Sequence, residues 1–177
     1  MAGVIISRKT IGEVRKLLDD SSEEIEVSLS PTQISFKTGE SVLISRLIEG
    51  NFPDYQRVIP ASNENILEVD ASLLTEAVDR ASLVATDKMR LVKLHAKPGL
   101  LQVTAFSSDA GSSVEELEVA YNGPQVEFGF NARYILDITQ QLSGHTLQFL
   151  IGDESQAIIV KEMGDESSLY VLMPLRV

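Results

Sequence analysis

One order of elements, β-α-β-β-β, occurs three times along the 177 residues. The period is roughly sixty residues, which is too long for an ordinary solenoid repeat. The predicted elements of the first copy are a strand at 3–7, a helix at 8–20 and strands at 24–30, 32–38 and 41–48. Those of the second copy are 65–70, then helix 71–87, then 90–96, 100–107 and 114–121. Those of the third are 125–131, then helix 132–142, then 146–152, 156–162 and 169–175.

Local signals support each copy. Every helix follows a residue able to cap it, namely Ser7, Asp70 and Asn131. Apolar residues recur at helical spacing and predict a buried stripe on each helix. The stripes are Ile11, Val14, Leu17 and Leu18; Leu73, Leu74, Ala77 and Ala81; and Ile135, Ile138 and Leu142. We therefore expect an α+β protein whose helices cover one face of mainly antiparallel sheets.

A single copy should not be stable alone, because one helix on a small sheet leaves exposed edges and an uncovered face. Two copies can cover each other, helix beside helix and sheet edge to sheet edge. Since three is an odd number, one copy lacks a partner. We expect residues 4–50 to expose an apolar helix stripe and an open edge, and to self-associate into a homodimer. The alternative is partial disorder of that segment.

Composition and motifs exclude several function classes. The chain has no cysteine and a formal net charge of −11, and it shows no signal peptide and no apolar run of membrane-spanning length. We find no nucleophile, phosphate-loop or zinc-protease motif, and His95 and His145 have no shared ligand spacing. These features predict a cytoplasmic protein that is not an enzyme, holds no cofactor or metal and does not bind membranes.

Positive charge gathers on the predicted helices. Arg8 with Arg15, and Lys9 with Lys16, share nearly one face of the first helix, while Arg80 and Arg133 lie on the others. Such a face could contact a phosphate backbone without reading bases, or it could be an ordinary solvated surface. The sequence pattern leaves both readings open.

The chain ends in "SSLYVLMPLRV", which is apolar on both sides of a predicted strand. We expect the strand to be covered on both faces and pairing to stop near Pro174, which has no N–H to donate. A core strand explains residues 169–172. Met173, Pro174 and Leu175 would lie at a rim.

Four stretches together resemble the bacterial β sliding clamp, the processivity factor of DNA polymerase III: "EGNFPDYQRVIP", "RASLVATDKMRLVKL", "EFGFNARYILD" and "LYVLMPLRV". In that family, six β-α-β-β-β units pair into three domains, and two chains close into a ring with helices lining the hole. The resemblance implies the DNA-clamp fold and a truncated clamp. Residues 1–50 would be the second half of the middle domain, and residues 51–177 a complete C-terminal domain.

The resemblance also implies sites. A pocket for short peptides would be built from Pro53, Arg57, Val58, Asn131, Tyr134, Val171, Met173, Pro174, Leu175 and Arg176. The residues facing DNA would be Arg8, Lys9, Lys16, Arg80 and Arg133. The face that meets another chain would contain Leu83, Val84, Asp109 and Glu115.

The implied partners are double-stranded DNA, bound weakly by this chain, the catalytic subunit of DNA polymerase III, the clamp loader, and other polymerases and repair proteins. The alternative function is a self-associating peptide-binding or regulatory module that cannot encircle DNA. Trapping on circular DNA separates the two.

Overall fold

A computed structural model describes residues 3–18, 24–86, 90–142, 144–153 and 155–175. The chain divides into two compact units, residues 1–54 and 55–177. The boundary expected from the sequence lay at 50/51. Each unit has its own apolar core, so each is described separately.

In its described residues, the first unit contains one helix and one sheet. Helix α1 (Arg8–Leu17) precedes the strands β1 (Glu26–Leu29), β2 (Gln33–Thr38) and β3 (Ser41–Arg46), which pair antiparallel in that order. The sequence predicted a strand at 3–7, and this prediction is wrong. In the structure the segment forms one isolated bridge, between Ile5 and Ile48. A strand needs a neighbour along its length, and the described part of this unit offers none at its second edge.

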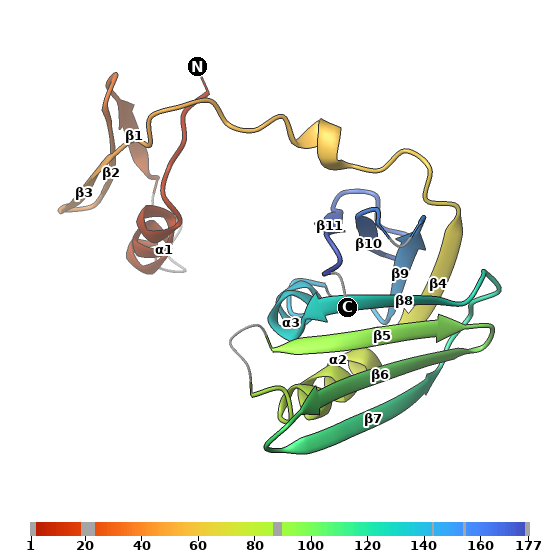
Figure 1. The fold of residues 1–177 in the computed structure, drawn as a ribbon. Coiled ribbons are helices and arrows are strands. Elements are labelled where there is room, and N and C mark those ends of the chain that lie inside the picture. Colours follow the sequence, from red (N-terminus) through yellow and green to blue (C-terminus); the bar gives the residue numbers. More distant parts are fainter. Residues whose placement is uncertain (1–2, 19–23, 87–89, 143, 154, 176–177) are drawn as a thin grey trace. The chain divides into compact units, whose positions relative to one another are not determined.

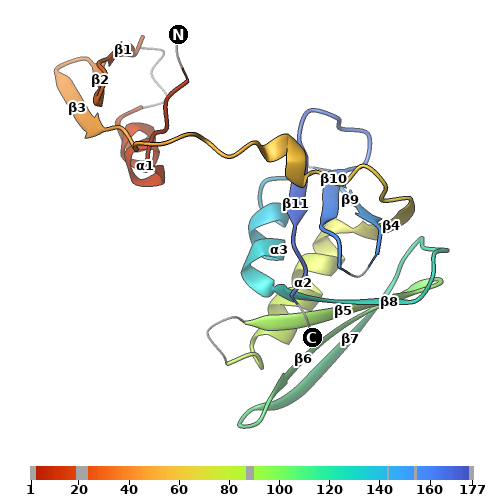
Figure 2. The ribbon, with the colours of Figure 1, turned by 45° about the horizontal axis from the view of Figure 1, so that its top comes forward.

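The part of the second unit that the structure describes forms two four-stranded antiparallel sheets and two α-helices (Figures 1 and 2). Its elements in chain order are η1 (Tyr55–Val58), β4 (Asn65–Asp70), α2 (Ala71–Ser82), β5 (Leu91–Lys97), β6 (Leu100–Ser107), β7 (Gly111–Glu118), β8 (Val126–Asn131), α3 (Ala132–Thr139), β9 (Thr146–Ile151), β10 (Ile158–Glu162) and β11 (Tyr170–Leu172).

The two repeats of this unit exchange their first strands. One sheet has the order β7-β6-β5-β8, and the other has the order β11-β10-β9-β4. Strand β4 therefore completes the sheet of the third repeat, and β8 completes that of the second. Helices α2 and α3 contact each other, as expected for paired repeats, and the core contains residues from both helices and both sheets.

The three predicted helix caps are confirmed. The side chain of Ser7 accepts from the Thr10 N–H at 3.1 Å, that of Asp70 from the Leu73 N–H at 2.9 Å, and that of Asn131 from the Arg133 N–H at 3.0 Å. Each bond satisfies a backbone donor that the first helical turn leaves open. Helices α2 and α3 end at Ser82 and Thr139, which is earlier than the predicted 87 and 142.

The predicted apolar stripes are partly wrong. Leu74, Ala77 and Ala81 are buried on α2, but Leu73 is exposed. On α1, Val14 is buried and packs near Ile34 and Phe36, whereas the other stripe residues, Ile11, Leu17 and Leu18, are exposed. The exposure of α1 agrees with the expectation that residues 4–50 present an apolar helix stripe to solvent.

Candidate functional site

A groove of about 590 Å³ lies in the second unit and brings together residues from three parts of the chain. Its lining residues are Arg57, Val58, Ile59, Pro60, Ala61 and Ser62, then Ser155, Gln156 and Ala157, and then Val171 and Met173. Four of them belong to the predicted pocket: Arg57, Val58, Val171 and Met173. A second hollow of about 470 Å³ in the first unit contains none of the predicted pocket residues.

Strand β11 determines which of the C-terminal residues point toward the groove. Leu172 is buried and pairs with Ile158, on the core side of the sheet. Because successive side chains alternate, Val171 and Met173 point to the opposite face. The expectation that both faces of this strand are covered holds in part, because Leu172 is buried on one face and Val171 is half-buried on the other. Met173 is exposed beside the groove, as expected for a rim residue.

Pairing along β11 stops before Pro174, as expected from the missing N–H. The chain then turns to the other sheet, where the Leu175 N–H donates to the Gly129 carbonyl at 2.8 Å. Pro174 and Leu175 are half-buried and do not line the groove. Thus Met173 is held between two fixed points, Leu172 in the core and Leu175 on β8.

Asn63 anchors the part of the groove lining formed by residues 57–62. Its Nδ2 donates to the carbonyl of Leu150 at 2.8 Å and to that of Ala157 at 2.9 Å. Asn63 thereby ties the segment that follows η1 to β9 and to the loop before β10. Sequence reasoning missed this residue, since its two acceptors lie 87 and 94 positions along the chain.

The other predicted pocket residues are placed elsewhere or outside the description. Asn131 caps α3, and Tyr134 is exposed on that helix; neither lines the groove. Pro53 belongs to the first compact unit. Arg176 lies outside the described residues. Four of the ten predicted residues therefore line the groove, and the peptide-binding role of all ten stays a prediction.

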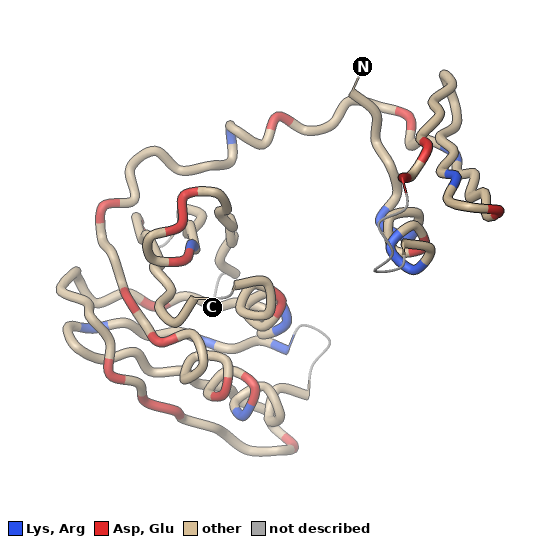
Figure 3. The backbone as a smooth tube through the Cα atoms, turned by 180° about the vertical axis from the view of Figure 1, so that it is seen from behind, with Lys and Arg blue, Asp and Glu red and all other residues tan. Residues whose placement is uncertain are grey.

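The basic residues differ in their surroundings. Arg8 and Lys9 are exposed at the start of α1, and Figure 3 shows further basic positions along this helix. Lys16 is exposed and pairs with Glu13 at 3.0 Å. Arg133 is exposed on α3. With Arg15, α1 carries four basic residues and one acidic residue, so this helix has a net positive charge.

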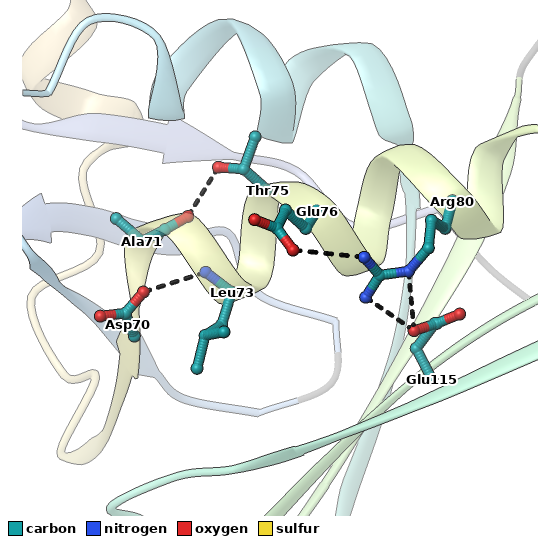
Figure 4. Close-up of polar contacts among 7 residues, drawn as sticks. All are labelled: Asp70, Ala71, Leu73, Thr75, Glu76, Arg80 and Glu115. Carbon is teal, nitrogen blue, oxygen red and sulfur yellow. Dashed lines mark hydrogen bonds and ion pairs between the residues drawn. The ribbon is translucent and has the colours of Figure 1, made fainter.

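Arg80 is engaged by carboxylates (Figure 4). Its guanidinium lies 2.9 Å from a Glu115 oxygen and 3.3 Å from a Glu76 oxygen. The hydrogen bonds to Glu115 raise the pKa of Arg80 above its ordinary value, and the hydrogen bond to Glu76 and the charge of that carboxylate act in the same direction. The positive charge of Arg80 is therefore compensated locally, which distinguishes it from Arg8 and Lys9.

One end of the second unit exposes large apolar side chains. Leu83, which follows α2, and Phe106 on β6 are both largely exposed, while Val84 is half-buried. The hydroxyls of Thr86 and Ser107 lie 2.9 Å apart, so the end of α2 and the end of β6 are neighbours. Asp109 lies in the adjoining turn. Sequence reasoning missed Phe106, whose strand pattern alone does not say which side is covered.

The described residues contain no group of three or more histidine, cysteine or acidic side chains able to hold a metal ion. No helix in the described part is long and apolar enough to cross a membrane. His95 lies on β5, and His145 is exposed in the turn before β9.

Comparison with known proteins gives a consistent result. A family model described as the DNA polymerase III beta subunit, C-terminal domain, matches residues 56–176, and the model of the central domain of the same subunit matches residues 1–54. The beta sliding clamp of Caulobacter vibrioides (strain NA1000 / CB15N) is 43% identical over 175 residues. That of Pseudomonas aeruginosa is 34% identical over 173 residues.

These two relatives are matched over 99% and 98% of this chain, but the chain spans 47% of the length of each. Among solved structures, a DnaN sliding clamp from Bartonella birtlesii bound to griselimycin superposes with a TM-score of 0.92 at 41% identity. A DNA polymerase sliding clamp from Caulobacter crescentus gives 0.91 at 42% identity. Both superpositions cover all of this chain, and they cover 48% and 47% of those chains respectively. The expected α+β clamp-type fold is confirmed.

Proposed function

The chain belongs to the family of the DNA polymerase III beta subunit, the bacterial β sliding clamps, and on this premise we propose that its groove binds short apolar peptides of replication and repair proteins. The chain spans about half the length of its relatives, so DNA encirclement and polymerase processivity are proposed for the assembly that contains it. We place that assembly in the bacterial cytoplasm and assign it no enzymatic activity.

The observation that carries the proposal is the convergence of Arg57 and Val58 with Val171 and Met173 on one groove. These residues come from the two ends of the second unit. The volume of about 590 Å³ falls within the range of ordinary ligand pockets, roughly 300–1,000 Å³. A site assembled from distant segments and left open on the surface is a better candidate for binding than for packing.

The lining predicts the chemistry of the ligand. Among the lining residues Arg57 is the charged one, and Val58, Ile59, Val171 and Met173 supply aliphatic and thioether surface. Methionine is flexible and polarisable, so Met173 can adapt to different apolar side chains. We expect a peptide with one or two large apolar side chains and a polar or acidic group near Arg57.

A matched pair of variants tests the groove. Met173→Ala removes an exposed lining side chain, and we expect it to weaken binding of an apolar peptide or of griselimycin by about 5- to 30-fold. Met163→Ala is the control, since Met163 is equally a surface methionine but does not line the groove. Fluorescence anisotropy measures both. Equal binding by the two variants, or no binding by the parent chain at millimolar concentration, would refute the proposal.

We also propose weak, sequence-independent binding of double-stranded DNA by the basic face of α1. Arg8 and Lys9 support it because both are exposed on a helix of net positive charge, whereas Arg80 is held by two carboxylates. Replacing Arg8 and Lys9 by alanine should reduce the slope of log K against log salt by about 1.8 if both contact phosphate. Arg80→Ala should change the slope much less.

The exposed end formed by Leu83 and Phe106 is our candidate for contact with another chain of the ring, with Val84, Asp109 and Glu115 beside it. The clamp loader and polymerases are proposed to bind through the groove. The alternative function, a peptide-binding module that pairs with itself, rests on the exposed apolar side chains of Ile11, Leu17 and Leu18.

A further inference from the structure

The loop between β7 and β8 contains the dipeptide Asn122-Gly123. Of the five asparagines in the chain, Asn122 alone is followed by glycine. Asparagine is a thermolabile residue, because the backbone nitrogen of the next residue can attack its side-chain carbonyl carbon. A glycine in that next position favours the attack, since it has no Cβ to crowd the approach and its backbone adopts more conformations than that of other residues.

The other asparagines differ from Asn122 in their contacts or in the residue that follows. The side chains of Asn63 and Asn131 are engaged: the first donates to two backbone carbonyls, and the second accepts from a backbone N–H of α3. Asn51 and Asn65 precede large side chains, those of phenylalanine and isoleucine. Asn122 is therefore the asparagine at which the attack meets the least hindrance.

The two reacting groups of this dipeptide are not held by other contacts. The side chain of Asn122 is exposed. In the part of the chain that the structure describes, this side chain forms no hydrogen bond, and neither does the backbone N–H of Gly123. No hydrogen bond has to break before the Gly123 nitrogen approaches the Asn122 Cγ.

The packing of the loop requires glycine at position 123. A Cβ there would lie 2.6 Å from the Tyr121 hydroxyl oxygen and 2.9 Å from the Asn65 Oδ1. Tyr121 is 1% exposed and its hydroxyl donates to the Pro124 carbonyl at 2.6 Å, so its ring cannot move aside without breaking that bond. The contacts that anchor the loop thus also exclude any side chain that would shield Asn122.

We propose that Asn122 is a site of spontaneous deamidation in the folded chain. The Gly123 nitrogen bonds to the Asn122 Cγ, the Cγ–Nδ2 bond breaks, and ammonia leaves with the proton of the Gly123 nitrogen, so that a cyclic succinimide forms. Water then opens the ring. Attack of water at Cγ gives aspartate with the original backbone, whereas attack at the backbone carbonyl carbon gives isoaspartate, in which the main chain runs through Cγ. Neither step changes an oxidation state, and water is the co-reactant.

The two products differ in their effect on the loop. Aspartate keeps the length of the backbone, so the Tyr121–Pro124 hydrogen bond and the packing of Gly123 are unchanged. Isoaspartate adds a carbon to the main chain between Tyr121 and Pro124, which this hydrogen bond joins. The addition also displaces Gly123 from its place against Tyr121 and Asn65. Isoaspartate therefore destabilises the second unit, and aspartate does not.

Mass spectrometry of the folded 177-residue chain, incubated at mildly alkaline pH, tests the site. Trypsin leaves Asn122 and Asn131 on one fragment, because residues 98–132 contain no lysine or arginine. We expect exchange of NH2 for OH at Asn122 and none at Asn131, whose side chain caps α3. Asn122→Gln is the matched variant: it retains an exposed amide but would need a larger ring, so we expect no loss of ammonia. Retention of the Asn122 amide over an interval in which the urea-unfolded chain loses it would overturn the proposal.

Urea unfolding of the separated products tests the effect on the loop. Chromatography separates the two forms, and enzymatic methylation of isoaspartate identifies that form. We expect the isoaspartate form to unfold at a lower urea concentration than the parent chain, and freshly prepared Asn122→Asp to unfold at the midpoint of the parent. An isoaspartate form as stable as the parent, or an equal loss of stability in Asn122→Asp, would contradict this account. None of these measurements involves the groove, so they are independent of peptide binding.

Discussion

Replacing Asn63 should release the groove residues that follow η1 from β9 and from the loop before β10. Its Nδ2 makes two hydrogen bonds to backbone carbonyls, at 2.8 and 2.9 Å. A neutral hydrogen bond contributes about 1 kcal/mol net. Its Oδ1 is buried and accepts no hydrogen bond from the described residues, and deleting that atom offsets part of the loss. We expect Asn63→Ala to lower the free energy of unfolding by about 1–2 kcal/mol.

The assay can report on the second unit alone. All four tyrosines of the chain, Tyr55, Tyr121, Tyr134 and Tyr170, lie in that unit, and there is no tryptophan. Urea unfolding followed by tyrosine fluorescence therefore measures its stability. Because Asn63 holds the 57–62 wall, the same variant should also weaken griselimycin or peptide binding under native conditions. Asn122→Ala, at an exposed loop position, is the control.

The aspartate variant tests the reasoning about donors. Asn63→Asp removes both N–H groups and places a carboxylate against two carbonyl oxygens, so it should cost more than Asn63→Ala at pH 7. The deficit should shrink as the pH falls through the raised pKa of the new carboxyl, since the protonated form can donate once. Two results would refute this account: a change below 0.5 kcal/mol for Asn63→Ala (the scatter of about that size expected of neutral surface sites), or a more stable Asn63→Asp at pH 7.

Three further predictions use the same unfolding assay. Gly152→Ala should destabilise the unit by about 1–3 kcal/mol, because the new methyl would lie 2.5 Å from the Asn63 Oδ1 and against the side chain of Gln156; an unchanged stability would show that the loop yields. Tyr121→Phe should cost about 1 kcal/mol, because the buried hydroxyl donates to the Pro124 carbonyl at 2.6 Å; a more stable variant would contradict it. Hydrogen bonds from the side chain and backbone of Ser167 lower the pKa of Asp165 below its ordinary 3.8. Its stabilising effect is thus present above that value and lost as the pH falls through the lower folded pKa. The stability difference from Asp165→Asn should therefore be larger at pH 6 than at pH 2, and a constant difference would count against it.

Local features of the fold were predictable because their causes are local. A cap needs a short polar side chain at one position, and Ser7, Asp70 and Asn131 all serve as caps. The strands 65–70 and 100–107 were predicted with the boundaries that the structure shows. Helix ends were less predictable, since residues after Ser82 and Thr139 continue an apolar pattern without continuing the helix.

The candidate site was predicted in part. The resemblance pointed to Val171 and Met173, and the alternation along β11 explains why they face the groove while Leu172 faces the core. Asn63 was missed because a polar residue in a loop has no periodic signal. The pairing of Arg80 with Glu115 was missed because it joins α2 to β7, 35 positions apart.

The sequence alone determined that the chain contains three copies of one small block and that the third has an unusual apolar end, because periodicity and caps depend on neighbours within a few positions. Only the tertiary structure decided that repeats trade their first strands. A strand's hydrogen-bonding partner is chosen by which apolar side chains become buried together across about eighty residues, as Leu67 and Phe149 are, and no short stretch of sequence contains that choice.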